Sequence, residues 1–131
     1  MKKSPVVHFE MPAKDLTRVA EFYKTAFGWD MNQLGPEMGD YLLAGTTDVD
    51  ENMMAKEPGA INGGFFKYED KPGYDVPHVV IQVENLNDSI ETVKAAGGTV
   101  NGEPMDIPGI GTYISITDTE GTNVGMLQPP K

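Results

Sequence analysis

The sequence contains no cysteine and only two histidines, at positions 8 and 78. Without cysteine there can be no disulfide framework, no thiolate nucleophile and no zinc–thiolate site. Basic side chains are also scarce: 10 Lys and Arg stand against 20 Asp and Glu, which gives a formal net charge of −10. This charge argues against nucleic acid or an anionic membrane as partner. It is compatible with a cationic or neutral ligand, but a solvated acidic surface that aids solubility is the favoured explanation.

Long apolar runs are absent as well, and the first residues show no signal-peptide pattern, because Met1–Pro5 leads straight into a predicted strand. We therefore expect a soluble, cytoplasmic protein that does not contact membranes. The length of 131 residues fits one domain with a substantial core.

The main positive feature is an internal repeat. His8–Gly28 matches His78–Gly98, 70 residues further along, with six identities in 21 positions. Each segment starts with His in an alternating, strand-like pattern and reaches Asp15 or Asn85, which are good helix N-caps. Each half would be only marginally stable alone, so we expect the two copies to share a core.

The pattern after each histidine predicts the order β-α-β-β-β twice. Unit one covers about residues 5–68, a linker covers 69–76, and unit two covers about 77–130, in a single domain 1–131. A long loop is expected at 46–59, and a Pro/Gly-rich loop at 102–111. In the first strand, alternation puts Phe9 and Met11 on the helix-facing side and His8 and Glu10 on the other side.

Several short motifs, taken in order, resemble the vicinal oxygen chelate superfamily of glyoxalase I, bleomycin-resistance proteins and extradiol dioxygenases. The resembling segments are the His8 strand before Asp15-Leu16, Glu21–Lys24, Phe27–Trp29, the His78 strand, Ala95–Gly98 and Asp118–Asn123. The resemblance implies an α+β fold, in which the two tandem units form a curved, half-barrel mixed sheet around a cleft with helices outside. It also implies a homodimer, which would cover the edge strands.

The metal enzymes of this superfamily use four ligands, one from the first and one from the last strand of each unit. His8 and His78 match the first-strand ligands, whereas the carboxylate places align with Gly63 and Gly125. Two neutral imidazoles lack the negative ligands that normally secure a divalent ion. We therefore expect no cofactor. The alternative is a divalent metal held by His8 and His78, with Glu10 as an unusual third ligand.

The same residues have other readings. If a reaction occurs, His8 and His78 are the natural acid–base pair, because imidazole titrates near neutrality. They are equally explained as satisfied histidines that face a polar cleft. Glu10 is a candidate catalytic base, a cation binder or the partner of a backbone donor.

Seven further residues are candidates for ligand binding, because alternation or the aligned glycine places put them at the expected cleft. They are Gln82, Phe65, Tyr113, Ser115, Asn123, Gly63 and Gly125. A solvated sheet face explains the polar members of this set equally well. Trp29, Tyr41 and Phe65 either line an apolar pocket or complete the core.

Three functions follow from these alternatives. The preferred hypothesis is a metal-independent protein that binds a small organic molecule, because glycine at both carboxylate places leaves room for a ligand. The second is a metal-dependent lyase, isomerase or dioxygenase of the glyoxalase type. The third is an interaction module without a ligand, which predicts no cavity large enough for an organic molecule.

Overall fold

The structure is a computed structural model that describes residues 2–52 and 54–130. Residue 53, inside the loop predicted at 46–59, lies outside the described residues. The chain divides into two compact units, which we call the first unit (His8–Pro77) and the second unit (the residues before His8 and those from His78 onward). The elements follow the predicted β-α-β-β-β order twice, and the predicted α+β class is confirmed.

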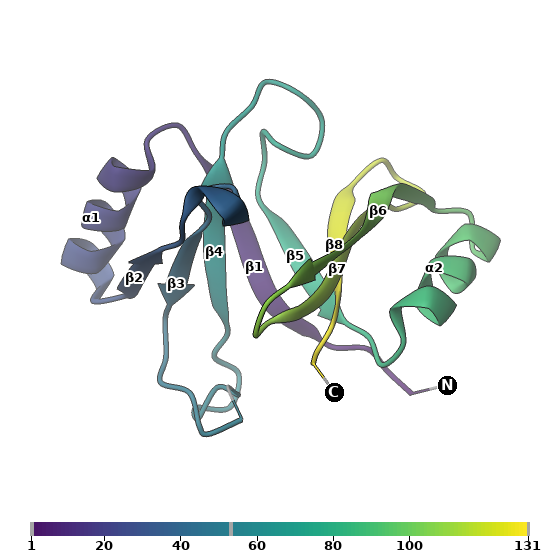
Figure 1. Ribbon diagram of the computed structural model, residues 1–131, viewed down its shortest axis with the longest axis horizontal. Coiled ribbons are helices and arrows are strands. Elements are labelled where there is room, and N and C mark those ends of the chain that lie inside the picture. The colour runs from purple at the N-terminus through teal and green to yellow at the C-terminus, as the bar shows by residue number, and fades with distance from the viewer. Residues whose placement is uncertain (1, 53, 131) are drawn as a thin grey trace. The chain divides into compact units, whose positions relative to one another are not determined.

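The first unit is a four-stranded mixed sheet with one helix on one face (Figure 1). Its elements are β1 (Val6–Ala13), α1 (Leu16–Phe27), β2 (Asp30–Gln33), the 3-10 helix η1 (Pro36–Met38), β3 (Leu42–Gly45) and β4 (Asn62–Lys67). The strand order is β2-β3-β4-β1, with β1 parallel to β4 and the other pairs antiparallel. The start of β1, at Val6 and Val7, is grouped with the second unit.

Helix α1 begins and ends as the sequence predicts. The Asp15 side chain accepts a hydrogen bond from the Arg18 backbone N–H at 2.9 Å, and Gly28 ends the helix in the left-handed conformation, with φ of 72°. One stripe of the helix packs on the buried core of the sheet. Its residues are Leu16, Val19, Ala20 and Tyr23, and the core residues are Ala13, Leu42, Ala44 and Phe65.

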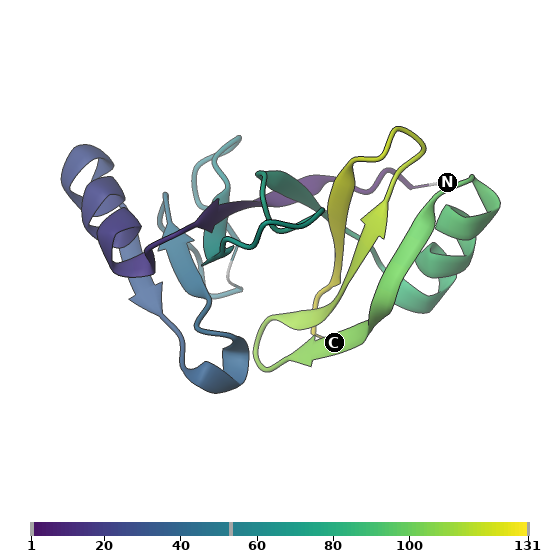
Figure 2. The same ribbon diagram turned by 90° about the horizontal axis from the view of Figure 1, so that it is seen from above.

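The second unit repeats this plan. Its elements are β5 (His78–Gln82), α2 (Leu86–Ala95), β6 (Thr99–Ile107), β7 (Gly111–Thr117) and β8 (Asn123–Gln128). The strand order is β5-β8-β7-β6, with β5 parallel to β8. Helix α2 lies alongside β6 (Figure 2) and closes a core of Val83, Leu86, Ile114, Ile116 and Met126.

One prediction of secondary structure is wrong. Residues 102–107, expected to belong to a Pro/Gly-rich loop, continue β6 as far as Ile107. The pairing of β6 with β7 shifts register between Asn101 and Met105, so a bulge absorbs Gly102, which has φ of 76°. Because β6 is an edge strand, Pro104 can lie in it without removing a ladder hydrogen bond from the sheet interior.

Among the described residues, no helix is long and apolar enough to cross a membrane.

Candidate functional site

The pairing of β1 with β4 shows which residues share the sheet face that α1 leaves uncovered. We call this the helix-free face of the first unit. His8 lies beside Asn62, and Glu10 lies beside Gly64, so these four residues share that face. The structure thus brings together two of the three predicted catalytic residues, His8 and Glu10, from alternate positions of one strand.

The predicted role of Gly63 is corrected by the same register. Gly63 pairs with Phe9, whose ring packs with the helix-covered core. A Cβ at Gly63 would lie 2.5 Å from that ring, so this glycine permits close packing on the helix side. Since adjacent strand residues point to opposite faces, an alignment error of one residue moves the side chain to the wrong face. Gly64 holds the place that the alignment gave to Gly63.

A tyrosine covers Gly64. A Cβ at position 64 would lie between 2.1 and 2.3 Å from atoms of the Tyr41 ring and hydroxyl. The Tyr41 hydroxyl donates a hydrogen bond to Oε2 of Glu10 at 2.7 Å. The absence of a side chain at position 64 therefore allows Tyr41 to cross the neighbouring strand and reach a carboxylate on β1.

Tyr41 was considered only as a residue that lines an apolar pocket or completes the core, although the sequence contains a signal for a polar role. Gly39-Asp40-Tyr41 matches Gly111-Thr112-Tyr113 in the second half of the chain. Tyr113 was a candidate on its own, and the repeat would have extended that role to Tyr41.

The electrostatics of His8 are set by two opposing effects. Burial lowers the pKa of this imidazole below its usual 6.5, and the negative charge of Glu10 raises it by a smaller amount. His8 is therefore mainly neutral at pH 7, so that one ring nitrogen donates a hydrogen bond and the other accepts one. Glu10 is then the only charged side chain of the four residues that define this face.

Asn62, beside His8, has a structural role. Its side-chain oxygen accepts hydrogen bonds from the backbone N–H groups of Thr46 at 2.7 Å and Thr47 at 3.1 Å. It thereby fixes the beginning of the long loop that follows β3 to the edge of the site.

The second unit has the same glycine arrangement without the carboxylate. Gly125 lies between Val80 on β5 and Ser115 on β7, and a Cβ there would come within 2.6 Å of the Tyr113 ring. Val80, 2% exposed, stands where the first unit has Glu10. His78 is half-buried at the start of β5, as His8 is in β1.

Two predicted ligand-binding residues of the second unit belong to a ladder of hydrogen bonds along its helix-free face. The Asn101 amide donates to Ser115 Oγ at 3.3 Å and to Thr117 Oγ1 at 3.0 Å. Thr117 in turn donates to Asn123 Oδ1 at 3.0 Å. The ladder supports the solvated-sheet reading of Ser115 and Asn123. The half-buried Gln82 shares this face, because Gln82 and Tyr113 both pair with Leu127.

Phe65 does not lie at the site. Its side chain is 1% exposed, and its ring centroid is 5.3 Å from that of Tyr23 in the helix-covered core. The Trp29 ring stacks on the same tyrosine at 4.6 Å between centroids. Both aromatic residues therefore complete the core.

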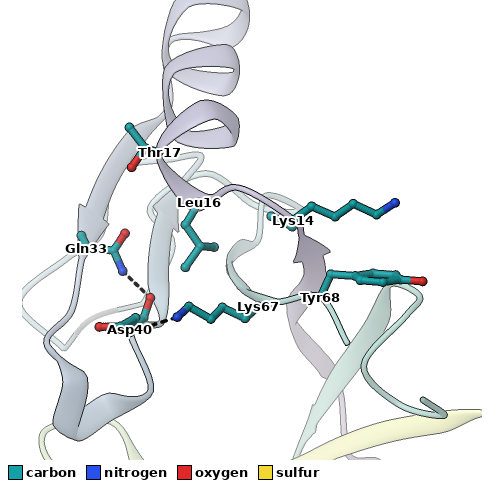
Figure 3. Close-up of a pocket in the computed structure, with 8 residues that line it drawn as sticks. Lys14, Leu16, Thr17, Gln33, Asp40, Lys67 and Tyr68 are labelled. Carbon is teal, nitrogen blue, oxygen red and sulfur yellow. Dashed lines mark hydrogen bonds and ion pairs between the residues drawn. The ribbon is translucent and has the colours of Figure 1, made fainter. Parts of the chain in front are cut away.

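A separate cavity of about 610 Å³ opens where β1 and β4 end and α1 begins (Figure 3). It is lined by Ala13, Lys14, Leu16, Thr17, Gln33, Asp40, Lys67 and Tyr68. Lys67 pairs with Asp40 at 3.5 Å, and the Gln33 amide donates to the Asp40 carbonyl. None of the predicted site residues lines this cavity.

Of the superfamily's four ligand places, only those at His8 and His78 carry a side chain that can bind an ion in this chain. Within either unit, the described residues form no group of three or more His, Asp or Glu side chains able to hold an ion. Both last-strand ligand places are glycine, and a tyrosine ring occupies the space that a side chain would need. The Glu10 carboxylate, the candidate substitute, accepts the Tyr41 hydroxyl.

The fold and these repeated strand positions define a protein of the vicinal oxygen chelate type. Residues 6–126 match the Glyoxalase/Bleomycin resistance protein/Dioxygenase superfamily, and the chain belongs to it. A probable lactoylglutathione lyase of Vibrio cholerae is 28% identical over 130 residues, which cover 98% of this chain and 93% of that protein. A lactoylglutathione lyase of Haemophilus influenzae is 28% identical over 126 residues, covering 94% and 91%.

Solved structures show the same fold at lower sequence identity. Methylmalonyl-CoA epimerase from Mycobacterium tuberculosis superimposes with a TM-score of 0.68 at 16% identity, covering 100% of this chain and 93% of the epimerase. A variant of the Streptomyces coelicolor epimerase, in complex with 2-nitronate-propionyl-CoA, gives a TM-score of 0.72 at 16% identity, covering 99% and 100%.

Proposed function

We propose that the protein binds a small organic molecule without the superfamily's four-ligand metal. The observation that carries this proposal is the pair of glycines, Gly64 and Gly125, each beneath a tyrosine ring at a last-strand ligand place. A divalent ion would lack both carboxylates that normally secure it there. The tyrosine rings fill the room that glycine was expected to leave for a ligand, so on this proposal the tyrosines and the polar strand residues themselves contact the organic molecule.

His8 and Glu10 supply the polar contacts of the first unit. A neutral imidazole beside a carboxylate offers acceptors for a ligand that donates hydrogen bonds. Gln82 and Tyr113 are the corresponding candidates of the second unit. Dimerisation and a cytoplasmic location remain predictions.

Equilibrium dialysis against Ni, Zn, Fe and Mn ions tests the absence of the metal site. We expect no stoichiometric binding tighter than about micromolar. Tighter binding of one ion per chain by the wild type, abolished in His8→Ala, would contradict the proposal.

A metal-dependent lyase, isomerase or dioxygenase is the second candidate. This candidate is favoured by the two relatives named above, a probable lactoylglutathione lyase and a lactoylglutathione lyase, which match nearly the full chain. On this hypothesis His8 and His78 hold the ion, Glu10 is the third ligand, and the ion polarises oxygens of the substrate.

An assay for lactoylglutathione formation by metal-supplemented protein separates the two candidates. Turnover that requires added metal and is lost in His8→Ala would establish the enzyme. No turnover with Ni, Zn, Fe or Mn, together with metal-free binding of an organic ligand, is the result expected from the binding proposal.

A further inference from the structure

We propose that Tyr41 is a positioning residue that fixes the carboxylate of Glu10 for a hydrogen-bond-donating ligand. Gly64 makes this possible, because it lacks a side chain and lets the Tyr41 ring pass over its strand. The inference rests on the proposed function, because it assigns the polar anchor of that same ligand. It gives Tyr41 and Gly64 roles that the sequence did not assign to them.

The Tyr41 hydroxyl reaches the Glu10 carboxylate across an intervening strand. Tyr41 precedes β3 and Glu10 lies in β1, and β4 runs between these strands. The Tyr41 side chain must therefore cross β4 to bring its hydroxyl to 2.7 Å from Oε2 of Glu10. A hydrogen bond from a neutral hydroxyl to a carboxylate is stronger than one between neutral groups, so it restricts the rotamers of Glu10.

Gly64 provides the space in which the Tyr41 ring lies. The Tyr41 ring can cross β4 only at a residue without a side chain, because a Cβ at position 64 would lie 2.1 to 2.3 Å from its atoms. Gly64 is buried within a strand and has no positive φ, so its backbone does not require glycine. The Tyr41 ring is therefore the reason for glycine at this position.

The position of Glu10 determines which ligand groups this face favours. Glu10 presents a carboxylate on the same face as His8. A fixed carboxylate favours hydroxyl, amine or amidine groups and disfavours carboxylates. The ligand class is thus a small molecule with a donor group directed at Glu10.

Benzamidine is a suitable probe, because its amidine matches a carboxylate, and benzoate is the matched anion with the same ring. Binding to the full-length protein is measured by titration while amide NMR signals of the β1, β3 and β4 residues are followed. We expect benzamidine to perturb the residues around Glu10 and benzoate to bind more weakly.

Tyr41→Phe keeps the ring and removes the hydroxyl. We expect benzamidine affinity to fall about three- to tenfold, in the range of one hydrogen bond, while benzoate affinity stays the same or rises. A merely structural role of Tyr41 would weaken both probes equally. Tyr68→Phe, the same substitution at a tyrosine outside the site, is the control and should change neither affinity.

Gly64→Ala should act like Tyr41→Phe, because the new Cβ displaces the ring and breaks the same hydrogen bond. The double variant should then lose no more affinity than either single variant. Additive losses, or equal benzamidine affinity in wild type and Tyr41→Phe, would overturn the positioning role. If neither probe perturbs the signals around Glu10 in the wild type, the proposed binding function itself fails at this face.

Discussion

The first and second units share a scaffold and differ in the polar groups of their helix-free faces. Each has a histidine on its first strand and a glycine beneath a tyrosine on its last strand. The first unit adds Glu10, which accepts the Tyr41 hydroxyl, whereas the second has the buried Val80 at that place. The glycine–tyrosine arrangement is thus a repeated packing feature, and in the first unit a carboxylate accepts the tyrosine hydroxyl.

The largest expected effect comes from placing the carboxylate of the first unit in the second. Val80→Glu buries a charged group where the side chain is now 2% exposed, and we expect a loss of about 2–4 kcal/mol in the free energy of unfolding. The loss should shrink at acidic pH, where the new carboxyl is neutral. Urea denaturation at pH 5 and pH 8 measures both. A neutral effect at pH 8 would mean that Tyr113 satisfies the carboxylate as Tyr41 does.

The next largest effect is expected at the two glycines beneath tyrosine rings, Gly64 and Gly125, and it shows whether they are equivalent. Gly64→Ala and Gly125→Ala each bring a Cβ against a tyrosine, at 2.1 and 2.6 Å at closest. We expect losses of about 1–3 kcal/mol in the free energy of unfolding, larger for Gly64→Ala because its contact is shorter and it breaks the Glu10 hydrogen bond. Pairing each with removal of its tyrosine ring, Tyr41→Ala or Tyr113→Ala, should show favourable coupling in a double-mutant cycle. Absence of coupling would disprove the steric account.

Helix capping should be nearly equal in the two units. Asp15 and Asn85 each accept a backbone N–H three residues on, from Arg18 at 2.9 Å and Asp88 at 3.0 Å. Asp15→Ala and Asn85→Ala should each cost about 1 kcal/mol, measured by thermal denaturation. A difference of more than about twofold would show that the helices contribute unequally despite the repeat.

The smallest effect concerns the pKa of His8. Burial lowers the pKa of His8, and Glu10 partly opposes this, so Glu10→Gln should lower the pKa of His8 further. NMR titration of the imidazole signals measures this change, with Glu84→Gln in the second unit as the control that leaves His8 unchanged. A rise in the pKa of His8 would show that Glu10 does not act on it electrostatically.

The lowered pKa of His8 also fixes the sign of its effect on stability. The unfolded chain binds a proton at His8 more readily than the folded chain, so the contribution of His8 is fully present above pH 6.5. It is lost as the pH falls from 6.5 toward the lower pKa of the folded state. His8→Gln should therefore reduce the dependence of stability on pH in that window.

The repeat predicted most of the fold because it depends on local signals. Each of these signals depends on a few neighbouring residues. They are the strand alternation around His8 and His78, the helix N-caps Asp15 and Asn85, and the helix end at Gly28. The extension of β6 through Gly102 and Pro104 was missed, since a bulge at a sheet edge accommodates residues that normally break strands.

The site was only partly predictable, because it depends on register between strands distant in sequence. The alternation of their own strand places His8 and Glu10 on one face, but the pairing of Glu10 with Gly64 requires the β1–β4 register. Phe65 was misassigned for the same reason, since its place beside Met11 puts it on the helix-covered face. Tyr41 could be found only through its match with Tyr113 or through the contact itself.

Our central proposal is that glycine beneath a tyrosine ring stands at the two carboxylate ligand places of this superfamily, so that no ion is held there, and native mass spectrometry of the full-length protein with Ni²⁺ tests it most directly. We expect a spectrum dominated by metal-free protein, with the same weak adducts in wild type and His8→Ala. A dominant adduct of one Ni²⁺ per chain in the wild type that disappears in His8→Ala would contradict it.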